Sequence, residues 1–203
     1  MSTHTADIAP TAEAVSPSSN ARVQRSRSRI IEASIDLIVE QGANALTVDA
    51  IAERSGVAKS TLYRHWRSID ALILDVFRAA VPPTLEPDPS ASFEESLRQQ
   101  VAAAAASMAD PRYVRLLPDL LALRHQYPEL GELADRDRAQ KEANLADILA
   151  AGAAEGRVPA DLDVRTVCIV LLGPMTSCAL LGEPERIDEV GAFAVERFLD
   201  SYR

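Results

Sequence analysis

The chain has few of the residues that build catalytic or metal sites, with two cysteines and three histidines among 203 residues. His4, His65 and His125 are scattered, without the partner spacing of a zinc-binding helix or a nucleophile elbow. Cys168 and Cys178 fall on one expected helix, about 15 Å apart along its axis, too far for a disulfide between them. We therefore expect no enzymatic activity, no metal and no cofactor. Both cysteines are interpreted as small buried residues, with redox sensing as the alternative.

Long apolar runs, alternating patterns and aromatic side chains are also scarce. No run of about 18 uncharged apolar residues is present, so we expect no membrane-spanning segment. Residues 1–20 lack the basic and then apolar order of a secretion signal, which favours a cytoplasmic location without membrane contact. No useful stretch alternates between apolar and polar residues, which predicts an all-α fold. Aromatic residues make up 4% of the chain, so its helices should pack through small and aliphatic side chains.

The segment Gly42–Trp66 has the pattern of two short helices joined by a glycine turn. Thr47 is placed to cap the first helix, and Gly56 to end it in the left-handed conformation. In the second helix Leu62 and Trp66 lie four residues apart and should face inward. Its other positions offer hydrogen-bond donors, namely Lys59, Ser60, Thr61, Tyr63 and Arg64. This layout is typical of a helix-turn-helix, whose second helix enters the major groove of DNA.

The same segment resembles the DNA-binding domain of the tetracycline-repressor (TetR) family over residues 27–80. The resemblance rests on Leu46–Val48, Ile51-Ala52, Ser55–Lys59 and Thr61–Trp66. It implies DNA contacts by Arg27, Thr47, Lys59, Ser60, Thr61, Tyr63, Arg64, His65 and Arg67. Tyr63 and His65 match family positions that hold phosphates. The alternative is that Tyr63 is an ordinary half-buried aromatic residue and His65 an ordinary surface histidine. The family usually has a lysine where this chain has Ile69, and Arg67 is the candidate to replace it.

The charge distribution supports a nucleic-acid partner for one end of the chain, despite a net charge of −9. Residues 20–67 contain eight basic and five acidic side chains, whereas the chain from Ser68 onward has a balance of −10. A basic head on an acidic body is expected when only one end meets DNA. Arg22, Arg25 and Arg27 precede the first expected helix, and Arg29 lies in its first turn. They form either a solvated lead-in or a basic arm for a neighbouring minor groove.

Proline, glycine and hydrophobic periodicity divide the chain into about nine helices. These cover residues 28–41, 48–55, 59–66, 69–80, 93–109, 111–127, 128–151, 164–181 and 185–201, with an irregularity at Pro118 and breaks at Gly152 and Gly156. The expected domains are a disordered tail at 1–21, an N-terminal three-helix DNA-binding domain at 22–67, a connecting helix at 68–81, a proline-rich linker at 82–91, and a C-terminal helical effector-binding and dimerisation domain at 92–203.

The second half resembles the effector-binding part of one TetR subgroup through Gly156–Pro159, Asp161–Asp163 and Leu172–Met175. The resemblance implies a cavity for a small molecule. Its candidate lining is Met108, Leu117, Leu121, Leu172 and Met175, with Arg124, His125 and Thr176 as the polar groups. The alternative is that the apolar members are ordinary core. The last two helices are expected to form the dimer interface through Val167, Val170, Leu171, Pro174, Ile187, Val190, Gly191, Ala194 and Phe198.

These patterns predict a homodimeric TetR-type transcriptional regulator. As a repressor, it would bind a near-palindromic operator in double-stranded DNA, and an apolar or amphipathic effector of unknown identity would release it. The alternative is a DNA-bound architectural or interaction protein without a small-molecule effector.

Overall fold

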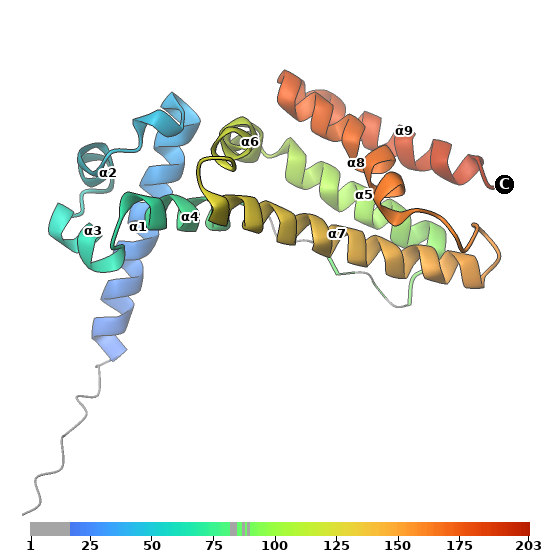
Figure 1. Cartoon of the computed structure of the whole chain (residues 1–203), viewed down its shortest axis with the longest axis horizontal. Coiled ribbons are helices and arrows are strands. Elements are labelled where there is room, and N and C mark those ends of the chain that lie inside the picture. Colours follow the sequence, from blue (N-terminus) through green and yellow to red (C-terminus); the bar gives the residue numbers. More distant parts are fainter. Residues whose placement is uncertain (1–16, 82–84, 87, 89) are drawn as a thin grey trace, which may run out of the picture.

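A computed structural model describes residues 17–81, 85–86, 88 and 90–203 (Figure 1). All regular structure among these residues is helical, which confirms the all-α prediction. The α-helices are α1 (Pro17–Gln41), α2 (Val48–Ser55), α3 (Lys59–His65), α4 (Ile69–Ala80), α5 (Phe93–Ala109), α6 (Pro111–Leu123), α7 (Pro128–Ala154), α8 (Val164–Leu181) and α9 (Ile187–Asp200). Short 3-10 turns occupy Ala43–Ala45 and Pro184–Arg186.

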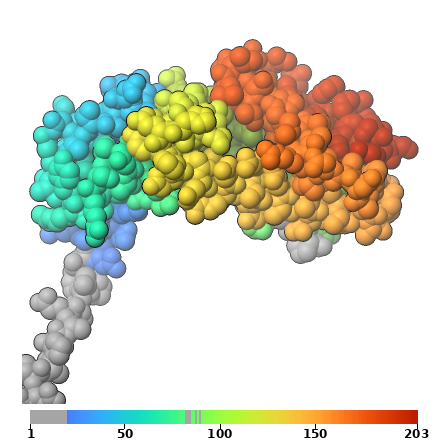
Figure 2. Space-filling view, in the orientation of Figure 1, coloured from blue at the N-terminus to red at the C-terminus, as the bar shows by residue number. Residues whose placement is uncertain are grey.

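The helices form two packed groups that meet at α6. We call α1 to α4 the head and α5 to α9 the body; the two lie at opposite ends of the molecule (Figure 1). The head core is built on residues such as Ile30, Ile51 and Phe77, but α6 adds Leu116 and Leu120 to it. Leu117, the next residue after Leu116, belongs to the body core instead. One helix therefore supplies side chains to both cores, and Figure 2 shows the yellow residues of α6 and early α7 packed between them.

Local chemistry in the head matches the sequence-based expectations. The Thr47 hydroxyl accepts a 3.1 Å hydrogen bond from the Ala50 amide at the start of α2. Gly56 ends that helix at φ 63°, in the left-handed region that favours glycine. Ser68 caps α4 by accepting from the Ala71 amide at 3.2 Å. Leu62 and Trp66 are 1% and 4% exposed, so the predicted inward face of α3 is confirmed.

The predicted start of the first helix is wrong. The helix begins at Pro17, well before residue 28, so residues 17–21 are helical where a disordered tail was expected. Residues 1–16 lie outside the described part of the chain. No glycine or proline interrupts residues 18–29, and the fixed φ of Pro17 suits a first helical turn. Because the core side of α1 is held by Ile30, Ile35 and Ile38, further helical residues are added without a new nucleation cost.

The expected break at Gly152 is also wrong, because α7 continues to Ala154. Gly152 is buried in the helix, and a Cβ at that position would lie 2.5 Å from the ring of Phe93. Glycine therefore serves close packing of α7 on α5 rather than termination, which falls to Gly156 at φ 71°. In α6, Pro118 lies inside the helix without ending it, and the helix stops at Leu123 instead of Tyr127.

By length and composition alone, α8 is long and apolar enough to cross a membrane, a test that the core helix of a globular protein also passes. Arg165 is its only charged residue. In the folded chain α8 packs against α5, α6, α7 and α9. Its apolar side chains therefore lie on two faces: one packs in the body core, and the other, described below, is on the outer surface.

Candidate nucleic-acid interface and effector cavity

The outer face of α3 presents the donors that the sequence indicated. Lys59, Ser60, Tyr63 and Arg64 are exposed, with Tyr63 at 58%, and Thr61 is half-buried. The opposite face is held against the head by Leu62 and by Trp66 just after the helix. The side chains of a short helix are thus fixed on one side and free to meet base edges or phosphates on the other.

Two predicted DNA-binding residues make contacts within the head. The Arg27 guanidinium donates to Asp75 at 2.6 Å and lies 5.5 Å from the centre of the Trp66 ring. Thr47 uses its hydroxyl as the cap of α2. These contacts fix α1 and α2 within the head, and any DNA contact by either residue remains a prediction.

Lys59 and His65 lie near the two ends of α3 and also have partners inside the head. Lys59 forms an ion pair with Asp49 of α2. His65 Nε2 is hydrogen-bonded to Ser26 Oγ of α1 at 2.7 Å. Partial burial lowers the pKa of His65 below its usual value of 6.5, and the charges of Arg27 and Arg64 lower it further. In the chain without DNA this lowered pKa favours the neutral imidazole.

The position of the missing family lysine is partly buried. Ile69 is the first residue of α4 and packs against the head core. Arg67, two residues earlier, is exposed. The structure thus leaves Arg67 accessible at the end of the recognition segment, while its role as a phosphate clamp stays a prediction.

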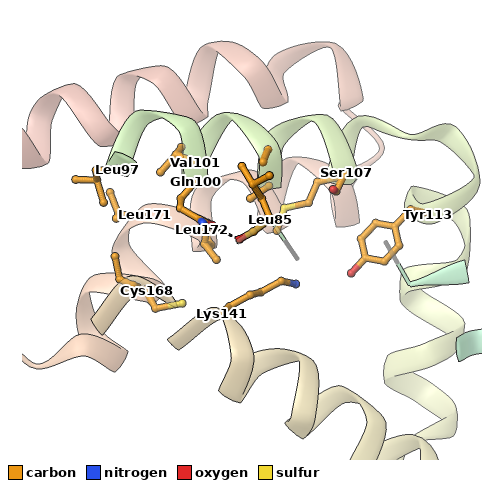
Figure 3. A pocket seen from close by; sticks show the side chains of 14 residues that line it. Leu85, Leu97, Gln100, Val101, Ser107, Tyr113, Lys141, Cys168, Leu171 and Leu172 are labelled. Carbon is orange, nitrogen blue, oxygen red and sulfur yellow. Dashed lines mark hydrogen bonds between the residues drawn. The ribbon is translucent and has the colours of Figure 1, made fainter. Parts of the chain in front are cut away.

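A cavity, with about 710 Å³ of empty space when its opening to solvent is included, lies in the body among α5, α6, α7, α8 and Leu85 before α5 (Figure 3). Most of its wall is apolar. Its lining consists of Leu85, Leu97, Gln100, Val101, Ala103, Ala104, Ser107, Met108, Tyr113, Lys141, Leu145, Cys168, Leu171 and Leu172. Its lining, apolar with a few polar groups, is typical of a site for a small organic ligand.

Leu85, before α5, is held at this cavity by two hydrogen bonds to its carbonyl. Gln100 of α5 donates to the Leu85 oxygen at 2.7 Å, and the buried Asn144 of α7 donates to the same oxygen at 2.8 Å. Gln140 in turn donates to the Asn144 side-chain oxygen at 2.8 Å. Leu85 thus forms part of the cavity wall, and it belongs to the segment that leads back to α4 and the head.

Known proteins match both parts of the chain. Residues 30–76 match the bacterial regulatory proteins of the tetR family, and residues 87–196 match the C-terminal domain of tetracyclin repressor-like proteins. The chain belongs to the TetR family. It is a transcriptional regulator with a helix-turn-helix DNA-binding domain, as the motif in α2 and α3 indicated.

Relatives of this TetR-family chain agree. The HTH-type transcriptional regulator YdeS of Bacillus subtilis is 28% identical over 148 residues, which cover 72% of this chain and 74% of YdeS. SrpR of Pseudomonas putida, also an HTH-type transcriptional regulator, is 25% identical over 193 residues, or 90% of this chain and 85% of SrpR. A transcriptional regulator from Rhodococcus sp. Rha1 shares the fold with a TM-score of 0.69, at 17% identity, across 86% of this chain and 96% of that one.

Two of the eight predicted effector-binding residues, Met108 and Leu172, line the cavity of this TetR-family protein. Leu117 and Met175 are buried in the body core, and the Thr176 hydroxyl donates to the Leu172 carbonyl at 3.0 Å. The remaining three lie at the far end of α6 and outside the cavity, namely Leu121 (37% exposed), Arg124 (3.7 Å from Asp135) and the exposed His125. Residue type alone suggested these three, whereas α6 borders the cavity near its start, through Tyr113.

Sequence reasoning missed the polar lining of the cavity, which consists of Gln100, Ser107, Tyr113 and Lys141. One signal was present in α5, where Leu97, Gln100, Ala104 and Ser107 recur at spacings of three and four residues along one helix face. A polar residue repeated on an apolar stripe can indicate a ligand-facing side. No comparable signal marked Tyr113 or Lys141, which reach the cavity from α6 and α7.

Five of the nine predicted dimer-interface residues are buried inside their own chain: Val167, Leu171, Ile187, Gly191 and Phe198. In the single chain these five side chains face the body core, because α8 and α9 pack on α5 with that side, so a role for them in a dimer interface stays a prediction. Val190 and Ala194 are half-buried, whereas Val170 and Pro174 are exposed. Further apolar side chains lie on the exposed surface of α8 and α9, namely Ile169, Leu180, Leu181 and Phe193.

Proposed function

We propose that this TetR-family regulator is a cytoplasmic, homodimeric repressor that binds a near-palindromic operator and leaves it when a small apolar or amphipathic effector enters the body. The exposed donor face of α3, fixed from behind by Leu62 and Trp66, carries the DNA-binding part of the proposal. In this arrangement Lys59, Thr61 and Arg64 read base edges, and Tyr63 and Arg67 contact phosphates.

Dimerisation is supported by the exposed apolar surface of α8 and α9. Ile169 and Val170 on α8 and Phe193 on α9 are more than half exposed, which is unusual for side chains of this size in an isolated chain. Pairing this surface with its copy around a two-fold axis buries it in a four-helix contact. The same axis places two α3 helices on one DNA face, with half-sites about 34–36 Å or somewhat further apart.

The effector part of the proposal rests on how the cavity is connected to the head. The cavity wall includes Tyr113 of α6 and Lys141 of α7, and these two helices also supply Leu116, Leu120 and Leu130 to the head core. A ligand that displaces α6 or α7 therefore acts on the orientation of α3. By linkage, a ligand that weakens operator binding tenfold, or about 1.4 kcal/mol, is itself bound ten times more weakly on the operator.

The test begins with the DNA that the protein retains. Genomic fragments bound by the purified full chain are sequenced, a duplex with the recovered motif is labelled, and its binding is followed by fluorescence anisotropy. We expect a near-palindromic motif, with two chains bound per duplex and much weaker binding to a scrambled duplex. Retention of unrelated fragments with equal affinity contradicts the proposal and favours an architectural protein. Small molecules are then screened for release of the labelled duplex.

A further inference from the structure

The cavity in the body has a charge of one sign. Among its described lining residues, Lys141 is the only one that is charged at neutral pH, and no aspartate or glutamate takes part. The other polar groups are the Gln100 amide, the Ser107 and Tyr113 hydroxyls and the Cys168 thiol. A cation in a largely apolar enclosure favours an anionic or hydrogen-bond-accepting group and disfavours a second cation.

The ammonium and hydroxyl groups of the lining lie toward one end of the cavity. In Figure 3 the Lys141 ammonium and the Tyr113 hydroxyl point toward one another, with Ser107 at the same end. Leu97, Leu171 and Cys168 lie at the other end. The cavity thus has one end suited to a polar head and one end suited to an aliphatic tail.

The Lys141 ammonium keeps donor capacity beyond its partner in the protein. It donates to Asp137, one turn earlier on α7, at 2.6 Å. An ammonium has three hydrogens, so two remain for a ligand or water. Asp137 does not line the cavity, so the charged group in the described lining is the Lys141 ammonium, with the Asp137 carboxylate 2.6 Å from it.

Tyr113 is a suitable second donor at this end. Its side chain is largely buried, and burial raises the pKa of its phenol above the usual 10.0. The phenol therefore stays protonated at neutral pH and has a hydrogen to donate. Together, Tyr113 and Lys141 can hold both oxygens of a carboxylate.

We propose that the effector cavity binds an amphipathic carboxylic acid, with its carboxylate between Lys141 and Tyr113 and its aliphatic chain along Leu97 and Leu171. This inference rests on the proposed function only in taking the cavity as the effector site. It adds the sign of the ligand charge and the residues that select it.

The test compares three probes with the same ten-carbon chain: decanoate, decanol and decylamine. Binding to the full chain is measured by titration calorimetry at pH 7.5, below the micelle-forming concentration of each probe. We expect decanoate to bind about tenfold or more tightly than decanol, because a charge-assisted hydrogen bond is stronger than a neutral one. Decylamine should bind most weakly.

Two variants of Lys141 assign the preference to that residue. Lys141→Met should reduce decanoate binding to the level of decanol and leave decanol binding unchanged, whereas Lys141→Arg should keep most of the preference. Arg136→Met removes an exposed cation from the same helix outside the cavity lining, so it serves as the matched control and should change nothing. Circular dichroism verifies that each variant is folded.

Equal binding of decanoate and decanol, tightest binding of decylamine, or an undiminished preference in Lys141→Met overturns the inference. Failure of all three probes to bind overturns it as well. The operator assay described above is run separately on the same samples. If decanoate binds through Lys141 but does not release the operator, the ligand class stands and the effector part of the proposed function fails.

Discussion

At the scale of single residues, Asp75 shows how one side chain decides the role of several others. Its carboxylate accepts from Trp66 Nε1 at 2.7 Å and from Arg27 at 2.6 Å, and Arg78 lies 3.5 Å away. These contacts of Asp75 connect α4 to α1 and to the end of α3. They also explain why Arg27, which looks like a free DNA-binding cation in the sequence, has a structural partner. The cations of the head are thus divided between internal contacts and the outer face.

Arg64 and Arg67 should differ in what they contribute to DNA binding. Arg64 lies on the outer face of α3, so Arg64→Ala should relax sequence preference and cost about 1–3 kcal/mol on the operator. Arg67 follows the helix, and Arg67→Ala should weaken all sequences alike and reduce the salt dependence of binding. Anisotropy titrations on operator and scrambled duplexes at several salt concentrations measure both effects. Equal losses with unchanged selectivity and salt slope would contradict the assignment.

His65 should make the stability of the head depend on pH. Its pKa is lowered in the folded chain, so the unfolded chain binds a proton more readily as the pH falls through about 6.5. The free energy of unfolding should therefore have its full value above that pH and should decrease below it. In His65→Gln this part of the decrease is removed, so urea unfolding between pH 7.5 and 5.5 should show a shallower slope. His125→Gln, at an exposed position, is the control, and an identical slope in both variants argues against this origin.

At the scale of helices, local sequence places most ends correctly, and packing decides the exceptions. The Ser92 hydroxyl caps the start of α5, and the Asp163 carboxylate caps the start of α8. Both helices begin where the sequence predicted. Gly152 is different, because its position under the Phe93 ring keeps it inside α7. A glycine is a helix terminator only where the backbone turns to positive φ, as at Gly156.

Gly152→Ala should destabilise the chain although alanine favours helices. The new methyl group would lie 2.5 Å from the Phe93 ring. Overpacking of this kind costs about 1–3 kcal/mol, and helix propensity returns at most about 1 kcal/mol. Gly131→Ala, on the same helix, meets only the Arg124 carbonyl oxygen at 3.5 Å and should be neutral or slightly stabilising. Thermal unfolding of both variants measures the difference, and a stabilised Gly152→Ala would show that the ring moves aside freely.

At the scale of the whole molecule, the exposed outer surface of α8 and α9 should determine the oligomeric state. A charge buried in a symmetric apolar contact is repeated in both copies and has no partner there. The double variant Val170→Asp with Phe193→Glu should therefore be monomeric, with helicity close to that of the wild type and sharply reduced operator affinity. Val170 is 51% exposed and Phe193 is 65% exposed in the single chain, so neither substitution disturbs the body core.

Sedimentation velocity and anisotropy measure these two effects on the same samples. Leu121→Glu places a charge at another exposed apolar residue, on α6, and should leave the oligomeric state unchanged. An unaltered dimer in the double variant would locate the contact elsewhere on the chain.

The sequence alone determined the all-α class, the helix-turn-helix and the inward direction of Leu62 and Trp66. These features depend on interactions between residues that are near one another in the chain. Three such patterns can be recognised without knowing what packs against the segment: a hydroxyl three residues before an amide, a glycine at a left-handed turn, and apolar residues four apart.

The tertiary structure alone decided which sides of α8 and α9 are buried, which residues line the cavity and which cations of the head are free. The long apolar sequence of α8 has no polar stripe, so its periodicity does not tell the inner face with Leu171 from the outer face with Ile169 and Val170. Lys141 and Tyr113 come from different helices and meet only when α6 and α7 pack. Such choices depend on which surfaces are covered by distant parts of the chain, and that information is not local.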